Sequence, residues 1–177
     1  MISTSFEKEE MKRKAFTLVE ILVAVVLLGI LAAVVLPTLQ GHPAIARESS
    51  AKDSLSTMRT QIEFYKMEHD GVPPGYINGS GAPTAILPYQ FNATTTITGA
   101  VSPSTTPTAP YLYGPYIRKM PENPYNNLTT IIYVAEATAF SAAVDGTSSG
   151  WLYKKETGEI RINWTGTDSE GANFYDY

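Results

Sequence analysis

Residues 16–36 read FTLVEILVAVVLLGILAAVVL, and this stretch decides how the rest of the chain is interpreted. After Glu20 it contains no charged side chain. As an α-helix it would be about 31 Å long, close to the roughly 30 Å of a bilayer's hydrocarbon core. A buried core helix is the alternative, but a chain of 177 residues has little material to cover such a helix on all sides. The pattern therefore predicts a membrane-spanning helix over 16–36.

The charges that flank this segment predict its orientation. Lys12, Arg13 and Lys14 come immediately before it, and clustered basic residues stay on the cytoplasmic side of a membrane. We therefore expect a single-pass inner-membrane protein with a cytoplasmic N-terminus and a periplasmic or extracellular head. A secretory signal is the alternative, although LAAVVLPTL after the apolar run is a weak cleavage site.

Glu20 is the one charge within the apolar segment. A charged side chain at the centre of a membrane helix costs about 2.5–3.5 kcal/mol, and less near the interface. Such residues usually have a functional partner. The alternative is that Glu20 lies at headgroup depth and stays hydrated.

The junction between the basic leader and the apolar segment carries a family resemblance. Lys-Arg-Lys-Ala15 followed by Phe-Thr-Leu-Val-Glu20-Ile-Leu resembles the signal of type IV pilins and type II secretion pseudopilins. The resemblance implies that prepilin peptidase removes the leader 1–15 by cutting between Ala15 and Phe16, and that the new amino group of Phe16 is methylated. Glu20 then stands fifth in the mature chain, as in the family. Alanine stands before the cut where the family usually has glycine.

The same resemblance implies how the segment is used. The family often has a glycine partway along the helix and a proline just beyond the apolar run, and Gly29 and Pro37 occupy these places. In a filament the Glu20 carboxylate would face the amino group of Phe16 on a neighbouring subunit. The implied partners are further copies of the chain, other pilin-like subunits, prepilin peptidase and an inner-membrane assembly platform.

Residues 37–69 are predicted to form an amphipathic stalk helix. Pro37 cannot donate a backbone hydrogen bond, so we expect a kink near it. Apolar residues then recur at spacings of three and four, which indicates one face packed against a head; a coiled-coil partner face is the alternative. Asp70-Gly71 and the prolines after it predict the end of the helix. The apolar stripe consists of Ala51, Leu55, Met58, Ile62 and Tyr65.

Residues 70–127 are predicted to be rich in loops, with a possible short helix near 83–91. The stretch 92–110 is rich in threonine and proline and reads as an irregular surface loop whose composition permits glycosylation. The tyrosines that follow are expected to pack against the stalk, with a binding patch as the alternative. These tyrosines are Tyr111, Tyr113 and Tyr116.

Residues 128–177 are predicted to contain a small sheet. Short β-branched or aromatic runs at 128–134, 139–144, 150–154 and 159–164 are separated by turn signals such as Asp-Gly and Thr-Gly. Hairpin-like spacing predicts an antiparallel sheet of three to four strands on the stalk. The fold class is therefore α+β, a long N-terminal helix packed against this sheet.

Nothing in the sequence predicts catalysis. Cysteine is absent, so thiolate chemistry and disulfides are excluded, and no phosphate loop or nucleophile elbow occurs. His42 and His69 lack metal-pair spacing and are expected to be solvated. A net charge of −4 without basic runs beyond the N-terminus argues against nucleic-acid binding.

Calcium is the single ligand to consider. The resemblance to major type II pseudopilins implies a calcium site in the loop near the C-terminal strands, built from carboxylates and backbone carbonyls. Asp145, Asp168 and Glu170 supply oxygen donors of the required kind, although the compact spacing of a calcium loop is missing. Solvated acidic turns are the alternative.

Taken with the resemblance, these patterns predict a structural subunit of a type II secretion pseudopilus and not an enzyme. A type IV pilus subunit for adhesion, motility or DNA uptake is the first alternative. The lack of the paired C-terminal cysteines of many adhesive pilins favours the pseudopilin. A monomeric membrane-tethered binding module, recognising its ligand through the tyrosine-rich loop, is the alternative from a different class.

Overall fold

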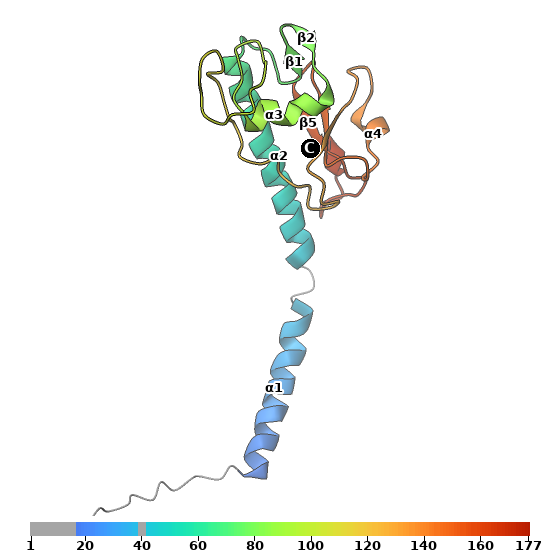
Figure 1. Cartoon of the computed structure of the whole chain (residues 1–177). Helices are drawn as coiled ribbons and strands as arrows, with labels where there is room; N and C mark the ends of the chain where they lie inside the picture. Colours follow the sequence, from blue (N-terminus) through green and yellow to red (C-terminus); the bar gives the residue numbers. More distant parts are fainter. Residues whose placement is uncertain (1–16, 39–41) are drawn as a thin grey trace, which may run out of the picture. The chain divides into compact units, whose positions relative to one another are not determined.

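A computed structural model describes residues 17–38 and 42–177. The chain divides into two compact units, residues 1–42 and residues 43–177, which are described separately. Figure 1 shows helix α1 in the first unit and the α+β head in the second. The leader 1–15 and Phe16 lie outside the described residues.

Helix α1 spans Leu18–Thr38. It continues through Gly29 and includes Pro37 in its last turn. The kink predicted near Pro37 is not confirmed by the described helix and stays a prediction. Within the described residues, no helix is identified as long and apolar enough to cross a membrane; the segment predicted to do so begins at Phe16, which is not described.

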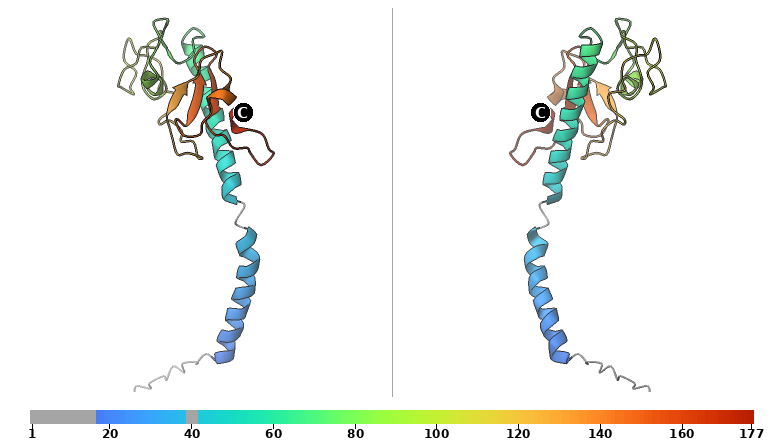
Figure 2. Two further views of the ribbon diagram at one scale, coloured as in Figure 1. Left: turned by 90° about the vertical axis from the view of Figure 1, so that its right-hand side faces the viewer. Right: turned by 90° about the vertical axis from the view of Figure 1, so that its left-hand side faces the viewer.

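Helix α2 spans His42–Glu68 and forms one side of the head (Figure 2). All five residues of the predicted apolar stripe are buried, each at most 2% exposed, so the prediction that this face packs against a head is confirmed. The predicted stop is also confirmed, because Asp70 and Gly71 follow the helix with φ angles of 54° and 81°. These left-handed conformations end a helix, and the Gly71 amide donates to the Lys66 carbonyl at 2.8 Å.

Short elements and loops fill the region after α2. Strands β1 (Tyr76–Ile77) and β2 (Ser80–Gly81) form a small antiparallel hairpin. A 3-10 turn at Thr84–Ile86 leads into helix α3, Leu87–Asn92, whose Leu87 and Phe91 are buried. Residues 93–130 contain isolated bridges and no named strand or helix, as expected for an irregular segment.

The main sheet has the order β3-β4-β5 and is mixed. Strand β3 (Ile131–Tyr133) pairs in parallel with β4 (Trp151–Lys154), and β4 pairs antiparallel with β5 (Glu159–Ile162). The prediction of a purely antiparallel sheet is therefore wrong for β3. The chain leaves β3 and returns through a long crossover, and such a connection brings the next strand back in the same direction.

That crossover contains a second correction. The segment 139–144, predicted to be a strand, holds the short helix α4, Phe140–Ala143. Alanine and serine dominate this segment, and alanine is a poor strand former but the best helix former. Phe140 attaches α4 to the sheet, because Lys154 on β4 and Arg161 on β5 lie 4.8 and 5.2 Å from the centroid of its ring.

The core of the head lies between α2 and the sheet (Figure 2). Trp151, Tyr153, Ile160 and Ile162 supply the sheet side and are fully buried. Strand β5 alternates, with Ile160 and Ile162 inward and Glu159 exposed, whereas β4 lies in the middle and buries three consecutive side chains. Phe174, in the 3-10 helix Phe174–Asp176, closes one end of this core.

Candidate functional site

The first candidate site is the surface of helix α1. Its large apolar side chains between Leu18 and Leu31 are between 50% and 83% exposed. Apolar surface of this extent is unfavourable in water and marks a contact with lipid or with other protein.

Glu20 lies in the first turn of α1, where Thr17 caps the helix. The Thr17 hydroxyl accepts a hydrogen bond of 3.2 Å from the Glu20 amide. Thr-x-x-Glu at a helix start is the pattern of a capping box, and a negative charge there is favoured by the helix dipole. The structure thus places the Glu20 carboxylate at the N-terminal end of the apolar helix. Ala15 and Phe16, the predicted processing residues, lie outside the described part of the chain.

Asp145, the first calcium candidate, caps a loop. Its Oδ1 accepts hydrogen bonds from the Thr147 amide at 2.9 Å, the Ser148 amide at 3.0 Å and the Asn163 side-chain amide at 2.8 Å. These donors, Thr147 foremost, hold the pKa of Asp145 well below its usual range. The carboxylate is therefore engaged in fixing residues 145–149.

Asn163 is the centre of that arrangement and was not singled out from the sequence as a structural residue. Its Oδ1 accepts from the amides of Asp145 and Gly146, and its Nδ2 donates to the carbonyl oxygen and hydroxyl of Ser149. Asn163 is fully buried at the end of β5. An asparagine directly after a strand is the only sequence signal of this role.

Asp168 and Glu170 lie in the segment 165–177, apart from the loop that Asp145 fixes. The Asp168 Oδ1 accepts the amides of Glu170 and Ala172 at 2.9 and 2.8 Å, and its Oδ2 accepts from Lys52 and Tyr177. Glu170 is exposed and contributes its amide to Asp168. Across residues 17–38 and 42–177, no three acidic or histidine side chains gather closely enough to hold a metal ion.

This donor set does not fit calcium as it stands. Calcium takes six to eight oxygen ligands at about 2.3–2.6 Å. Both oxygens of the buried Asp168 carboxylate already accept hydrogen bonds within the chain, one of them from an ammonium group. The three acids named as calcium candidates form no common site.

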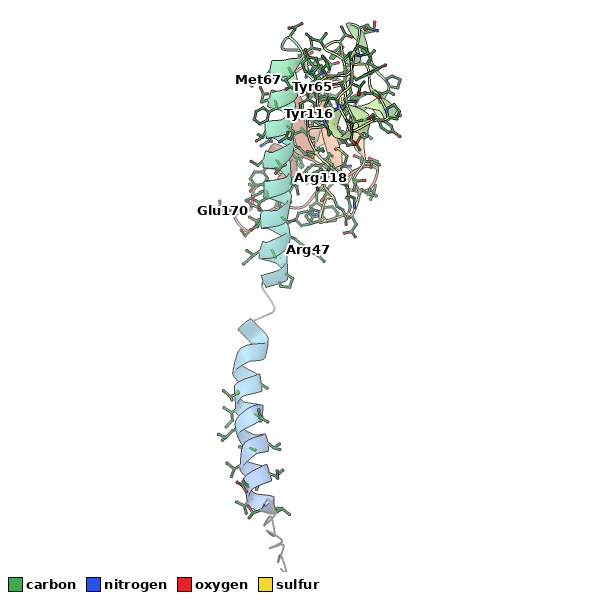
Figure 3. All side chains as sticks on the ribbon, turned by 60° about the vertical axis from the view of Figure 1, so that its left-hand side comes forward. Arg47, Tyr65, Met67, Tyr116, Arg118 and Glu170 are labelled. Atoms are coloured by element: carbon green, nitrogen blue, oxygen red, sulfur yellow. The ribbon has the colours of Figure 1, made fainter. Side chains whose placement is uncertain are left out.

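An aromatic cluster lies where the end of α2 meets the tyrosine-rich loop; Figure 3 shows Tyr65 and Tyr116 there. The rings of Tyr65 and His69 stack with centroids 3.6 Å apart, and Tyr113 and Tyr116 pack on them at 5.3 Å. The expectation that these two tyrosines pack against the stalk is confirmed, and the Tyr116 hydroxyl donates to Glu68 on α2 at 2.5 Å.

His69 corrects the expectation of a solvated histidine. It is 1% exposed, and its ring nitrogens lie 2.8 Å from the Tyr65 carbonyl oxygen and 3.0 Å from the Thr95 hydroxyl. Burial lowers the pKa of His69 below its ordinary value. Thr95 is itself buried, so part of the threonine-rich stretch forms core rather than surface loop.

Comparison with known proteins agrees with the motif at the N-terminus. The family model of the prokaryotic N-terminal methylation motif matches residues 11–36. The chain is 30% identical over 118 residues to the type II secretion system core protein G of Dickeya chrysanthemi, covering 66% of this chain and slightly less than two thirds, 65%, of that protein. It is 30% identical over 124 residues to the protein of the same name from Vibrio cholerae, covering 68% and 70% of the two chains.

A shorter match is to the fimbrial protein EcpB of Eikenella corrodens, 37% identical over 62 residues, or 35% of this chain and 38% of that protein. No solved structure matches this chain significantly.

Proposed function

We propose that this chain, which belongs to the family of type II secretion system core protein G, is a structural, non-catalytic subunit of a secretion pseudopilus. The observation that carries the proposal is helix α1, an apolar helix whose described side chains are exposed. Such a helix is stable against lipid or against other helices of its kind. In this role it is a membrane anchor before assembly and the packing element of a filament afterwards.

Processing and anchoring follow from the N-terminal sequence. Prepilin peptidase removes residues 1–15 by cutting between Ala15 and Phe16, the new amino group is methylated, and residues 16–36 cross the inner membrane once with the head outside. The basic residues before the segment and its apolar length support this proposal. The partners are other pilin-like subunits and an inner-membrane assembly platform.

Glu20 sets the register of assembly in this proposal. Cleavage creates a positive amino group on Phe16, and a neighbouring subunit presents its Glu20 to that group. Two charges in an apolar surrounding are tolerated when they pair and are costly when they do not. A subunit at the wrong stagger leaves both charges unpaired, so misplaced subunits are rejected.

Mass spectrometry of the mature protein from membranes tests the processing step. We expect an N-terminus at methylated Phe16. An Ala15→Gly variant, which restores the residue usual in the family, is expected to be processed at least as fast as the natural chain. A mature chain that begins beyond Pro37 would overturn the proposal, as would one that retains the leader.

Assembly is tested with Glu20→Gln, which removes the charge and keeps the size. We expect this variant to be cleaved normally but to enter filaments poorly when the secretion genes are overexpressed. Glu63→Gln is the matched control, because Glu63 is 65% exposed and pairs with Lys66 on the same helix. Equal filament yields from both variants would contradict the role of Glu20.

A subunit of a type IV pilus is the second candidate, favoured by the short match to a fimbrial protein. The two functions differ in what leaves the cell. Electron microscopy of material sheared from cells at natural expression levels is expected to show no long fibres of this protein if it builds a pseudopilus. Long surface fibres containing the chain would establish the pilus instead, and a chain recovered only as a monomer in membranes would indicate a tethered binding module.

A further inference from the structure

Lys52 reaches from helix α2 to the C-terminal segment 165–177. Its ammonium nitrogen lies 2.8 Å from Glu48 Oε1 on the same helix and 3.3 Å from Asp168 Oδ2 in the segment. It also lies 4.4 Å from the centroid of the Tyr177 ring, a cation–π distance. One cation is thus shared by two carboxylates and an aromatic ring that come from two parts of the chain.

Glu48 makes a second connection between the same two parts. Its Oε2 accepts a hydrogen bond of 3.0 Å from the Ser169 amide, and its Oε1 accepts one of 3.3 Å from the Ser169 hydroxyl. Figure 3 places Glu170, the next residue of the segment, beside the lower half of α2. We call Glu48, Lys52 and Asp168 together the Lys52 clamp.

Asp168 is the buried half of the clamp. Its side chain is 0% exposed, whereas that of Lys52 is 36% exposed. Burial alone would raise the pKa of Asp168, but the amides of Ala172 and Glu170 and the Lys52 ammonium outweigh it, so the pKa lies below its ordinary value. A buried carboxylate of this kind needs a cation or several donors to remain charged, and here it has both.

We propose that the Lys52 ammonium takes the place of a divalent cation in fixing the segment 165–177 to helix α2, so that the head folds without calcium. The resemblance to major type II pseudopilins implies calcium in the loop near the C-terminal strands. The candidate acids Asp145, Asp168 and Glu170 form no common site among the described residues. The positive charge that the carboxylates need comes from the chain itself. The inference concerns the folding of the head and stands whether or not the chain builds a pseudopilus.

The test is the thermal unfolding of the full chain in detergent micelles. Tryptophan fluorescence is a suitable readout, because Trp164 stacks on Tyr125, which in turn packs on Phe174 of the segment. We expect the midpoint to be the same, within about 1 °C, in excess calcium and in excess chelator. A rise of several degrees in calcium would overturn the proposal, and this result does not depend on any variant folding.

Lys52→Met removes the ammonium and keeps most of the apolar stem. We expect it to lower the midpoint by about 4–8 °C, because it leaves the buried Asp168 without its ion pair. Lys66→Met is the matched control: Lys66 lies on the same helix and pairs with Glu63 at 2.9 Å, but not with the segment. Its midpoint is expected to change by less than about 2 °C. Equal changes in the two variants would contradict the clamp.

Two further variants separate the ion pair from general damage. Lys52→Arg keeps a cation and is expected to melt closer to the natural chain than Lys52→Met does. Lys52→Met combined with Asp168→Asn leaves no buried charge and is expected to melt above Lys52→Met alone. In hydrogen exchange, the amides of Glu170 and Ala172 should exchange faster in Lys52→Met while those of β4 and β5 do not. Uniform loss of protection over the head would contradict a local clamp.

Discussion

Replacing Asn163 by alanine removes the side chain that organises the loop after α4. In the natural chain its carbonyl oxygen accepts the Asp145 amide at 3.0 Å and the Gly146 amide at 2.9 Å. Its amide group donates to Asp145 Oδ1 and to Ser149, and all of these contacts lie within the span 145–149. The substitution therefore leaves the loop without its attachment to β5.

The expected loss follows from the groups that are left without partners. The hydrogen bond from the Gly146 backbone N–H is buried, and the one from the Asp145 N–H is partly buried. A buried polar group that loses its partner lowers the free energy of unfolding by about 1–3 kcal/mol. The Ser149 carbonyl oxygen adds nothing to this loss, because it still accepts a hydrogen bond of 2.8 Å from the Asn126 side chain. We expect Asn163→Ala to lower the free energy of unfolding by about 3 kcal/mol, or the midpoint by about 10 °C.

Both tryptophans, Trp151 and Trp164, lie in the head, so urea unfolding followed by tryptophan fluorescence measures the head specifically. Asn173→Ala is the control, because its side-chain bond, to Asp176 at 2.9 Å, is exposed. That variant is expected to change the free energy of unfolding by less than about 0.5 kcal/mol. A loss below about 1 kcal/mol for Asn163→Ala would refute the reasoning that this residue holds the loop.

Three further predictions use the same measurement. Gly150→Ala should lower the free energy of unfolding by about 1–3 kcal/mol or more, because the new Cβ would lie 2.9 Å from the Leu128 carbonyl carbon, a backbone atom. Gly81→Ala is the control and should change it little, because its Cβ would meet only the flexible end of the Lys155 side chain. Equal losses in the two variants would contradict the backbone clash at Gly150. Leu55→Ala, at a side chain 2% exposed, should cost about 3 kcal/mol, and a loss below about 1 kcal/mol would contradict its place in the core. Because burial lowers the pKa of His69, the unfolded chain binds a proton more readily than the folded head does. The head should therefore lose stability as the pH falls below 6.5, the ordinary pKa of histidine. An unchanged free energy of unfolding between about pH 7 and pH 5.5 would contradict this.

The elements that formed as predicted are those encoded by neighbouring residues. The apolar stripe of α2 depends on spacings of three and four, and its end depends on Asp70 and Gly71, so both were predictable from short stretches of sequence. The hairpin of β4 and β5 is likewise local, since the Gly158 turn lies between two runs that face each other. The motif around the Ala15–Phe16 junction indicated the family by resemblance, without any tertiary contact.

Two features that differed from prediction depend on contacts between distant residues. The parallel pairing of β3 with β4 is set by the route of the crossover, and β-propensity carries no information about strand direction. His69 is buried because Thr95 and the tyrosines of a later loop close over it, so its own neighbours in sequence do not reveal it.

By itself, then, the sequence determined the apolar N-terminal helix, the buried face of α2 and the family, because each depends on periodicity or on a short motif. Only the tertiary structure decided the roles of the acidic residues. Asp145 meets Asn163 and Asp168 meets Lys52 across separations of 18 and 116 residues. A carboxylate at a turn has the same local sequence whether it faces water, a metal ion or an ammonium group, and the difference lies entirely in what the fold brings to it.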